Sequence, residues 1–205
     1  MQFEGNPDLD PETLKAYEAG MRCRFADRLE TEVSTFYNDM DDSFDFMLDT
    51  TTTNVFRIRN ATRIETYGAE FSSKLKITDT ISAFLNYTFT DGEYDEFLAM
   101  PGVEGNELAY LAKHKAGIGV NYATEKGWSH SFSLRYIDSR FGDAQNTDDQ
   151  KMDDYIVGDF HSRVPLYKGV TLTLDVNNVF DEEYNEFPAY EQPDRTVMIG
   201  IEAEV

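Results

Sequence analysis

The stretch RTVMIGIEAEV, residues 195–205, alternates apolar residues with small or polar ones. A period of two indicates a β-strand, because successive side chains of a strand point to opposite faces. One face would carry the apolar side chains of Val197, Ile199, Ile201, Ala203 and Val205. The other face would carry Met198, Gly200, Glu202 and Glu204. Two glutamates predict that this second face contacts water, so the apolar face must contact either a protein core or lipid.

The same alternation recurs along the whole chain. It predicts further strands at residues 14–25, 29–38, 55–77, 81–89, 116–122, 128–137, 155–160 and 170–177. The fold class that follows is all-β, an antiparallel up-and-down meander of about nine strands. Several of these strands have ~10 residues or more, which is the length of a tilted strand that crosses a membrane.

The expected connections alternate between short and long. Short turns are predicted at residues 26–28, 78–80, 124–127 and 168–169, and long polar loops at 39–54, 91–112, 138–150 and 181–193. Short turns on one side and long loops on the other are typical of outer-membrane barrels. The first long segment is rich in aspartate but lacks the glycine of a calcium-binding EF-hand loop, so we interpret it as a solvated surface loop.

Composition narrows the function classes. The chain has 205 residues, 18 basic and 39 acidic, and a formal net charge of −21. A nucleic-acid partner would need a basic footprint, which this balance excludes. The single cysteine, Cys23, cannot form an internal disulfide and is expected as a small apolar residue of a strand.

The sequence has no run of the ~20 apolar residues that a membrane-spanning helix needs. The mean hydropathy of −0.52 still allows a membrane barrel, because only alternate residues of each strand would face lipid. Residues 1–5 lack the pattern of a secretory signal. Bacterial single-chain barrels have an even number of strands, so an odd count predicts a fragment of a longer chain.

Aromatic residues lie near the ends of the predicted strands. In a membrane barrel they would form a girdle at the interface, and in a soluble sandwich they would be core. The residues concerned are Tyr37, Tyr87, Phe89, Trp128, Tyr136 and Tyr155.

Two motifs point to a family. The segment NVFDEEY occupies residues 178–184, and PDRT occupies 193–196. With the preceding YIVGD at 155–159 and the final alternating strand, this order resembles the end of a TonB-dependent outer-membrane receptor. The resemblance extends through YGAE at 67–70 back to NPDLDPE at 6–12, so residues 1–205 are interpreted as the carboxyl-terminal part of such a receptor's β-barrel. Ala112 stands where the family usually has proline, so the resemblance does not fix the angle at which the chain leaves the loop 91–112.

The resemblance supplies the positions of interest. They are Gly68, Glu70, Asp159, Asn178, Phe180, Asp181, Tyr184, Arg195 and Thr196. It also implies a cell outer-membrane location in a Gram-negative bacterium and transport of a scarce nutrient such as a ferric siderophore, haem or cobalamin. The implied partners are membrane lipid and lipopolysaccharide, the barrel-assembly machinery, the ligand, and the TonB complex through an amino-terminal part outside this chain.

Enzymatic signatures are missing from the sequence. His114, His130 and His161 lack the spacing of metal ligands, and no G-x-S-x-G motif occurs, so we expect no enzyme, cofactor or metal site. Two other interpretations remain: a small self-closing outer-membrane barrel of roughly eight or ten strands, and a soluble acidic β-sandwich that acts as a binding module.

Overall fold

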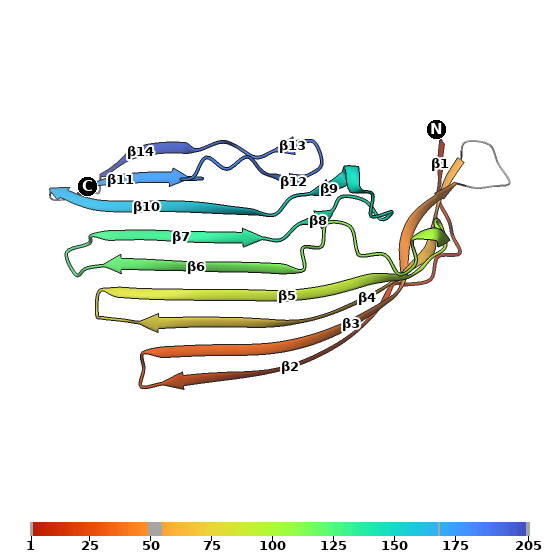
Figure 1. Ribbon diagram of the computed structural model, residues 1–205, viewed down its shortest axis with the longest axis horizontal. Helices are drawn as coiled ribbons and strands as arrows, with labels where there is room; N and C mark the ends of the chain where they lie inside the picture. The colour runs from red at the N-terminus through yellow and green to blue at the C-terminus, as the bar shows by residue number, and fades with distance from the viewer. Residues whose placement is uncertain (1, 49–54, 168, 204–205) are drawn as a thin grey trace.

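Figure 1 shows one antiparallel sheet whose strands run side by side, with short turns at one end and long loops at the other. This computed structural model describes residues 2–48, 55–167 and 169–203. Nine strands follow one another in the order β14-β11-β10-β7-β6-β5-β4-β3-β2, so each main strand pairs with its neighbours along the chain. The predicted meander of about nine strands is therefore confirmed.

The main strands have the following bounds. They are β2 Thr13–Phe25, β3 Leu29–Leu48, β4 Val55–Lys76, β5 Ile81–Phe97, β6 His114–Ala123, β7 Ser129–Ile137, β10 Tyr155–Tyr167, β11 Val170–Asn177 and β14 Thr196–Ala203. We call the side with the turns at 26–28, 77–80 and 124–128 the turn end. The side with residues 98–113, 138–154 and 178–195 is the loop end.

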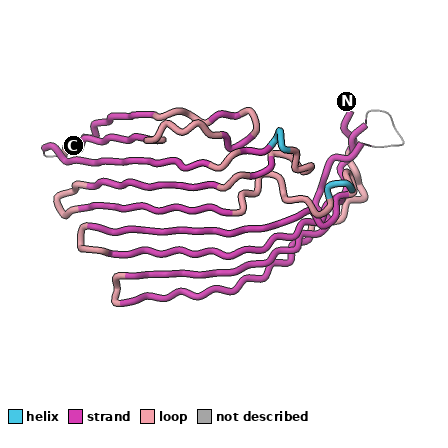
Figure 2. Tube along the Cα trace, viewed as in Figure 1, coloured by secondary structure: helices cyan, strands magenta, loops and turns pink. Residues whose placement is uncertain are grey.

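The minor elements all lie at the loop end. Strand β1 (Gln2–Glu4) pairs in parallel with β4. The pairs β8 (Arg140–Phe141) with β9 (Lys151–Met152), and β12 (Asn185–Phe187) with β13 (Tyr190–Glu191), form two small sheets within the loops. Figure 2 places the two short helical turns, η1 (Pro101–Val103) and η2 (Asp148–Gln150), among these same loops.

Two of the four expected loops partly belong to strands of the main sheet, and these predictions were wrong. Residues 39–48 extend β3, and residues 91–97 extend β5; residues 49–54 lie outside the described residues. Both extensions are acidic, which is why they suggested loops. The ladder continues through them because a neighbouring strand supplies compensating charge: the Nε atom of Arg63 on β4 lies 3.0 Å from Oδ1 of both Asp39 and Asp41.

The final strand behaves as predicted over its described part. Val197, Ile199 and Ile201 share one face and are well exposed, whereas Glu202 lies on the other face and pairs with Arg163 of β10 at 2.5 Å. Glu204 and Val205 lie outside the described residues, so their predicted faces stay predictions.

One register row crosses the whole sheet and is apolar in every strand. From β2 to β14 its members are Phe25, Leu29, Leu75, Ala83, Val120, Phe132, Phe160, Val176 and Val197. We call this side of the sheet the apolar face. Many of its large side chains are exposed, for example Ile199 at 73% and Ile201 at 72%. A continuous apolar surface of this extent marks contact with lipid or with another protein surface.

The opposite side, the polar face, carries mixed residues. The adjacent row reads Arg24, Glu30, Lys74, Phe84, Gly119, Ser133 and Asp159. No helix long and apolar enough to cross a membrane occurs in the described part of the chain.

The sheet is a single layer with little core. The accessible surface is 13591 Å² for a mass of 23.5 kDa, against about 9,800 Å² for a compact monomer of that mass. The few buried apolar side chains lie mainly at the loop end, and include Ala61, Phe97, Val103, Ala112, Met152, Tyr155 and Val157. The soluble β-sandwich interpretation needs a second large sheet, and the other sheets of the described residues are only the two small pairs within the loops.

The two edges of the sheet stay apart. Strands β2 and β14 lie at opposite ends of the strand order, and their described residues do not pair with each other. The alternative of a small self-closing barrel is therefore not what this chain forms. Residues Leu14–Phe25 and the final strand behave as expected for strands taken from a wider sheet.

The aromatic girdle stays a prediction, but most of its proposed members lie on the apolar face, as a girdle would require. Tyr37, Tyr87, Phe89 and Tyr136 lie on the apolar face, where register pairs them with other apolar-face residues. Tyr155 was wrongly included, because it lies on the polar face and only 4% of its surface is exposed.

Candidate functional site at the loop end

Asn178 organises the last loop, residues 178–195. Only 3% of this side chain is exposed. Its Nδ2 donates to the carbonyl oxygens of Glu182 at 2.9 Å and Pro193 at 3.4 Å, and its Oδ1 accepts from the Glu182 backbone N–H at 2.9 Å. Its own N–H donates to Asp159 Oδ1 at 3.0 Å. The side-chain amide thus joins the two ends of the loop, and the backbone N–H of the same residue fastens them to β10.

The local backbone explains why asparagine stands there. Asn178 has φ of 53° and Asp181 has φ of 63°, in the left-handed region that asparagine and aspartate tolerate better than most residues. Asp181 then accepts from the Arg195 backbone N–H at 2.9 Å and from its guanidinium at 3.1 Å. The hydroxyl of Thr196 accepts from Asn177 Nδ2 at 3.2 Å.

Phe180 and Tyr184 lie on opposite faces of the sheet. A Cβ at Gly158, on the apolar face, would meet the Phe180 ring at 2.8 Å, so this glycine makes room for the ring. Tyr184 packs against Tyr155 on the polar face, with ring centroids 4.3 Å apart. The loop therefore contacts both faces of the sheet, through Phe180 on the apolar face and Tyr184 on the polar face.

Seven of the nine positions singled out in the sequence come together in this way. We name Asp159, Asn178, Phe180, Asp181, Tyr184, Arg195 and Thr196 the motif knot. Gly68 and Glu70 lie elsewhere, on β4. Glu70 accepts from the Ser34 hydroxyl at 3.5 Å, at the limit of a hydrogen bond.

Position 68 has no room for a side chain, so only glycine fits there without strain. A Cβ there would lie 2.5 Å from Cζ of Phe36 and 2.2 Å from the carbonyl oxygen of Phe89. We therefore predict that Gly68→Ala destabilises the assembled sheet by about 1–3 kcal/mol through overpacking. The matched control is Gly117→Ala, also on the polar face, where the nearest atom would be 3.9 Å away. Unfolding in urea checks this, and equal shifts for the two variants would contradict it.

Two residues near the motif knot, Arg135 and Arg140, were not predicted from the sequence. Arg135 and Arg140 each place Cζ 5.8 Å from the centroid of the Tyr155 ring. Arg140 is 6% exposed, and its Nη2 donates to the backbone oxygens of Asn185 at 3.0 Å and Glu186 at 3.3 Å. Arg135 pairs with the Glu186 carboxylate at 3.5 Å. Both cations bind the last loop through Asn185 and Glu186. No sequence signal distinguished them from the other arginines of the chain.

The neighbouring loops are fastened to one another. The side-chain amide of Asn146 pairs with the backbone of Glu107 as a residue of a neighbouring strand would. Its Oδ1 accepts from the Glu107 N–H at 2.8 Å, and its Nδ2 donates to the Glu107 carbonyl at 2.9 Å. The Tyr110 and Phe187 rings lie 5.4 Å apart and join the loop after β5 to the β12–β13 hairpin. The three loops therefore form one connected cap.

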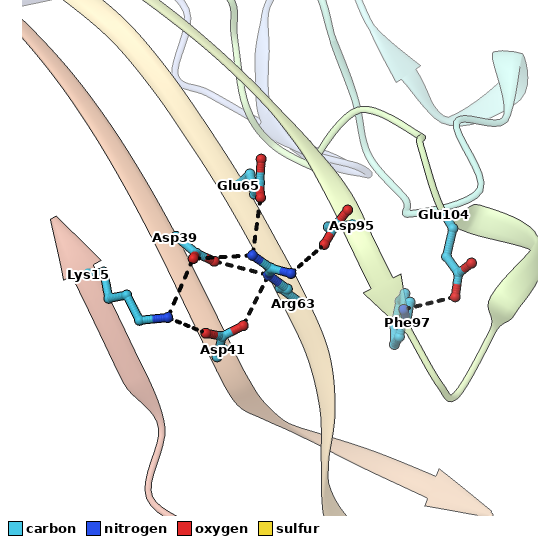
Figure 3. Close-up of polar contacts among 8 residues, drawn as sticks. All are labelled: Lys15, Asp39, Asp41, Arg63, Glu65, Asp95, Phe97 and Glu104. Carbon is cyan, nitrogen blue, oxygen red and sulfur yellow. Dashed lines mark hydrogen bonds and ion pairs between the residues drawn. The ribbon is translucent and has the colours of Figure 1, made fainter. Parts of the chain in front are cut away.

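A second polar cluster lies on β2–β5, drawn in Figure 3. Arg63 contacts the carboxylates of Asp39, Asp41, Glu65 and Asp95, at distances between 3.0 and 3.4 Å. Lys15 contacts Asp41 at 2.9 Å and Asp39 at 3.6 Å. Two cations thus share four carboxylates, and the network holds the strand extensions together.

Two charged side chains of the loops are stabilised by neighbouring polar groups. Hydrogen bonding to Glu107, and to Asp91, raises the pKa of Lys113 against the opposing effect of burial. Hydrogen bonds from the Thr147 hydroxyl and N–H lower the pKa of Asp143. Among the described residues, no three histidine, cysteine, aspartate or glutamate side chains are grouped to hold a metal ion. His114, His130 and His161 bond instead to Tyr87, Ser162 and Asp175.

Comparison with known proteins places this geometry. Residues 1–179 match the family described as TonB dependent receptor-like, beta-barrel. The metal-pseudopaline receptor of Pseudomonas aeruginosa is 27% identical over 185 residues, which cover 87% of this chain and 25% of that protein. The ferrichrome outer membrane transporter and phage receptor of Escherichia coli is 29% identical over 182 residues, 85% of this chain and 23% of that protein.

Solved structures agree on the fold. The siderophore receptor PiuA from Acinetobacter baumannii superposes with a TM-score of 0.80 at 22% identity, covering 95% of this chain and 29% of that one. The chain spans about a quarter of the length of the curated relatives quoted above. With the family model matched over most of its residues, the chain belongs to the TonB-dependent receptor β-barrel family.

Proposed function

We propose that residues 1–205 are the carboxyl-terminal part of the barrel of an outer-membrane transporter. The transporter takes up a scarce nutrient, such as a ferric siderophore, with energy from the TonB complex. The names of the relatives support the ligand class: they include receptors or transporters for metal-pseudopaline, ferrichrome and ferrioxamine B. We place the TonB contact and the plug that fills the barrel in parts of the receptor outside these residues.

The apolar row across all nine strands is the observation that carries this proposal. An exposed apolar face fits lipid, and alternate polar residues fit the lumen of a wide barrel. We assign the apolar face to membrane lipid and the turn end to the periplasm. The loop end then faces the outside of the cell, where lipopolysaccharide surrounds it.

The open edges fit the same assignment. Among the described residues, strand β2 and strand β14 each have one side that pairs with no other strand. An unpaired backbone group in hydrocarbon costs several kcal/mol. In the receptor, further barrel strands would cover both sides. The barrel-assembly machinery is the partner that would bring these strands together in the membrane. The motif knot would then fix the last outer loop to the wall.

Uptake of radioactive iron tests the transport function. Cells that produce the full-length receptor, with and without a working TonB complex, are given a panel of ferric siderophores. We expect at least one complex to be taken up only when both the receptor and the TonB complex are present. A receptor that reaches the outer membrane yet gives no TonB-dependent uptake of any panel member or of haem or cobalamin would refute the proposal.

A further inference from the structure

We infer that the loop end selects ligands of net positive charge, through the field of its loops rather than through one contact. This inference rests on the proposed function and names the class of ligand within it. Its basis is an uneven distribution of charge between the two ends of the sheet.

The excess of acid is concentrated at one end. The segments 91–113, 138–154 and 178–195, all described, hold 18 acidic residues and 4 basic ones, a balance of −14 out of −21 for the whole chain. The turns 26–28, 77–80 and 124–128 hold three acidic and two basic residues. If the acidic residues served solubility alone, we would expect them at the turn end as well as at the loop end.

Three of the four cations of these loop segments are paired with carboxylates or buried, and the fourth, Lys151, is exposed. Lys113 pairs with Glu107 at 2.8 Å and Asp91 at 3.1 Å, and Arg195 pairs with Asp181 at 3.1 Å. Arg140 is buried beneath the last loop, and Lys151 lies over the Phe141 ring at 5.4 Å. An anionic ligand that approaches these segments therefore meets 18 acidic residues and one exposed cation that is held only by an aromatic ring, Lys151.

A cavity of about 350 Å³ opens between two of the loops. Its lining includes four acidic residues and the aromatic Tyr184 together with one cation, Lys151; the acidic residues are Asp149, Asp153, Asp154 and Glu183. The pairing of β8 with β9 connects one wall to Arg140, which donates to the backbone oxygens of Asn185 and Glu186 in the other wall. Aromatic and acidic groups together suit a cation, since a ring face attracts positive charge.

Electrostatic attraction can act on a charged ligand before the ligand contacts the loops. A cleft lined by charge of one sign raises the local concentration of oppositely charged ligands, and can change association rates by about 10–1000-fold. The effect reaches about 8 Å at physiological ionic strength, and buried or partly enclosed groups are screened less. The preference for cations should therefore weaken in high salt.

The first test reads the field without any ligand. In the full-length receptor with Cys23→Ala, a nitroxide is attached at Gln145→Cys in the loops or at Ala123→Cys near the turns. Relaxation by anionic chromium trioxalate is compared with relaxation by a neutral nickel chelate. Relative to the neutral reagent, we expect the anionic reagent to be excluded about tenfold more strongly at the loop label than at the turn label. Equal exclusion at both labels would overturn the inference.

Matched variants identify the source of the field. Asp149→Asn, Asp153→Asn and Asp154→Asn together remove three exposed carboxylates at the cavity. The control removes three at the turns, by Asp27→Asn, Asp79→Asn and Glu125→Gln. The first set should reduce the exclusion at the loop label and the second should leave it unchanged. The opposite result would show that the cavity does not create the field.

The second test measures selection of ligands. Ferrioxamine B is cationic, and capping its free amine with acetyl or succinyl groups gives neutral and anionic complexes with the same metal core. Binding to the purified full-length receptor, by equilibrium dialysis, should decrease in that order, by about tenfold overall at low salt. A reversed or flat order refutes selection of cations. Because the nitroxide test does not need transport, loss of TonB-dependent uptake alone would overturn the transport function and leave this inference standing.

Discussion

Replacing Ile199 by arginine should prevent most of the receptor from assembling in the outer membrane. Ile199 lies in the middle of β14 on the apolar face and is 73% exposed. Arginine facing lipid at mid-membrane costs about 2–4 kcal/mol, which is a large part of the stability of most folded domains. The folded receptor in outer-membrane fractions, recognised by its heat-dependent mobility in gels, measures the effect.

The neighbouring Met198 provides the control. It lies on the polar face and is also exposed, so Met198→Arg introduces the same charge one residue away but towards the lumen. It is preferable to Gly200→Arg, because a Cβ at Gly200 would lie 2.6 Å from the Thr173 hydroxyl. We expect near-normal assembly of Met198→Arg. Equal loss from both arginines would show that the two faces are assigned wrongly.

Replacing Asn178 by alanine should release the last loop and destabilise the barrel. The change leaves partly buried carbonyl and N–H groups of the loop without their side-chain partner, and it places alanine at φ of 53°. Together these effects amount to about 2–4 kcal/mol. Thermal unfolding of the purified full-length receptor checks the loss, and limited proteolysis should cut first within 178–195.

Asn177→Ala is the matched control. This adjacent asparagine is exposed and makes one side-chain bond, to the Thr196 hydroxyl at 3.2 Å. We expect its effect to stay below about 0.5 kcal/mol, as for most surface changes. If the two asparagines had similar effects, the motif knot would not be the anchor of the loop.

Alternation alone predicted most of the wall. It located β11 at residues 170–177 and β2 to within one residue, because a half-buried or lipid-facing strand must alternate. It also assigned Val197, Ile199 and Ile201 to one face. These features depend on neighbours two residues apart, which a single sequence displays directly.

The strand extensions could not be predicted in the same way. Residues 39–48 and 91–97 are acidic, and acidic residues are poor strand formers in isolation. Their strand structure depends on partners distant along the chain, such as Arg63 with Asp39 and Asp95. Tyr155 was misplaced for a related reason: its burial results from the last loop, which folds back over it.

The motif knot was found by resemblance, and its geometry came from the structure. The sequence suggested Asn178 and Asp181 as important, while the left-handed backbone at both positions explains why. The loop contacts of Arg140 and Asn146 carry no local pattern at all. They join segments about 40 residues apart, and only folding brings those segments together.

The order of the nine strands has a consequence for how quickly the wall can form. Each pairing in that order joins strands that are neighbours along the chain, so each hairpin closes a loop of modest length. Loop-closure entropy and mean contact separation, which slow folding as they grow, are therefore small for this part of the receptor. Joining β14 to the first strand of a closed ring would link the most distant partners. We expect that joining step to set the folding time, with the nine strands already in place as its template.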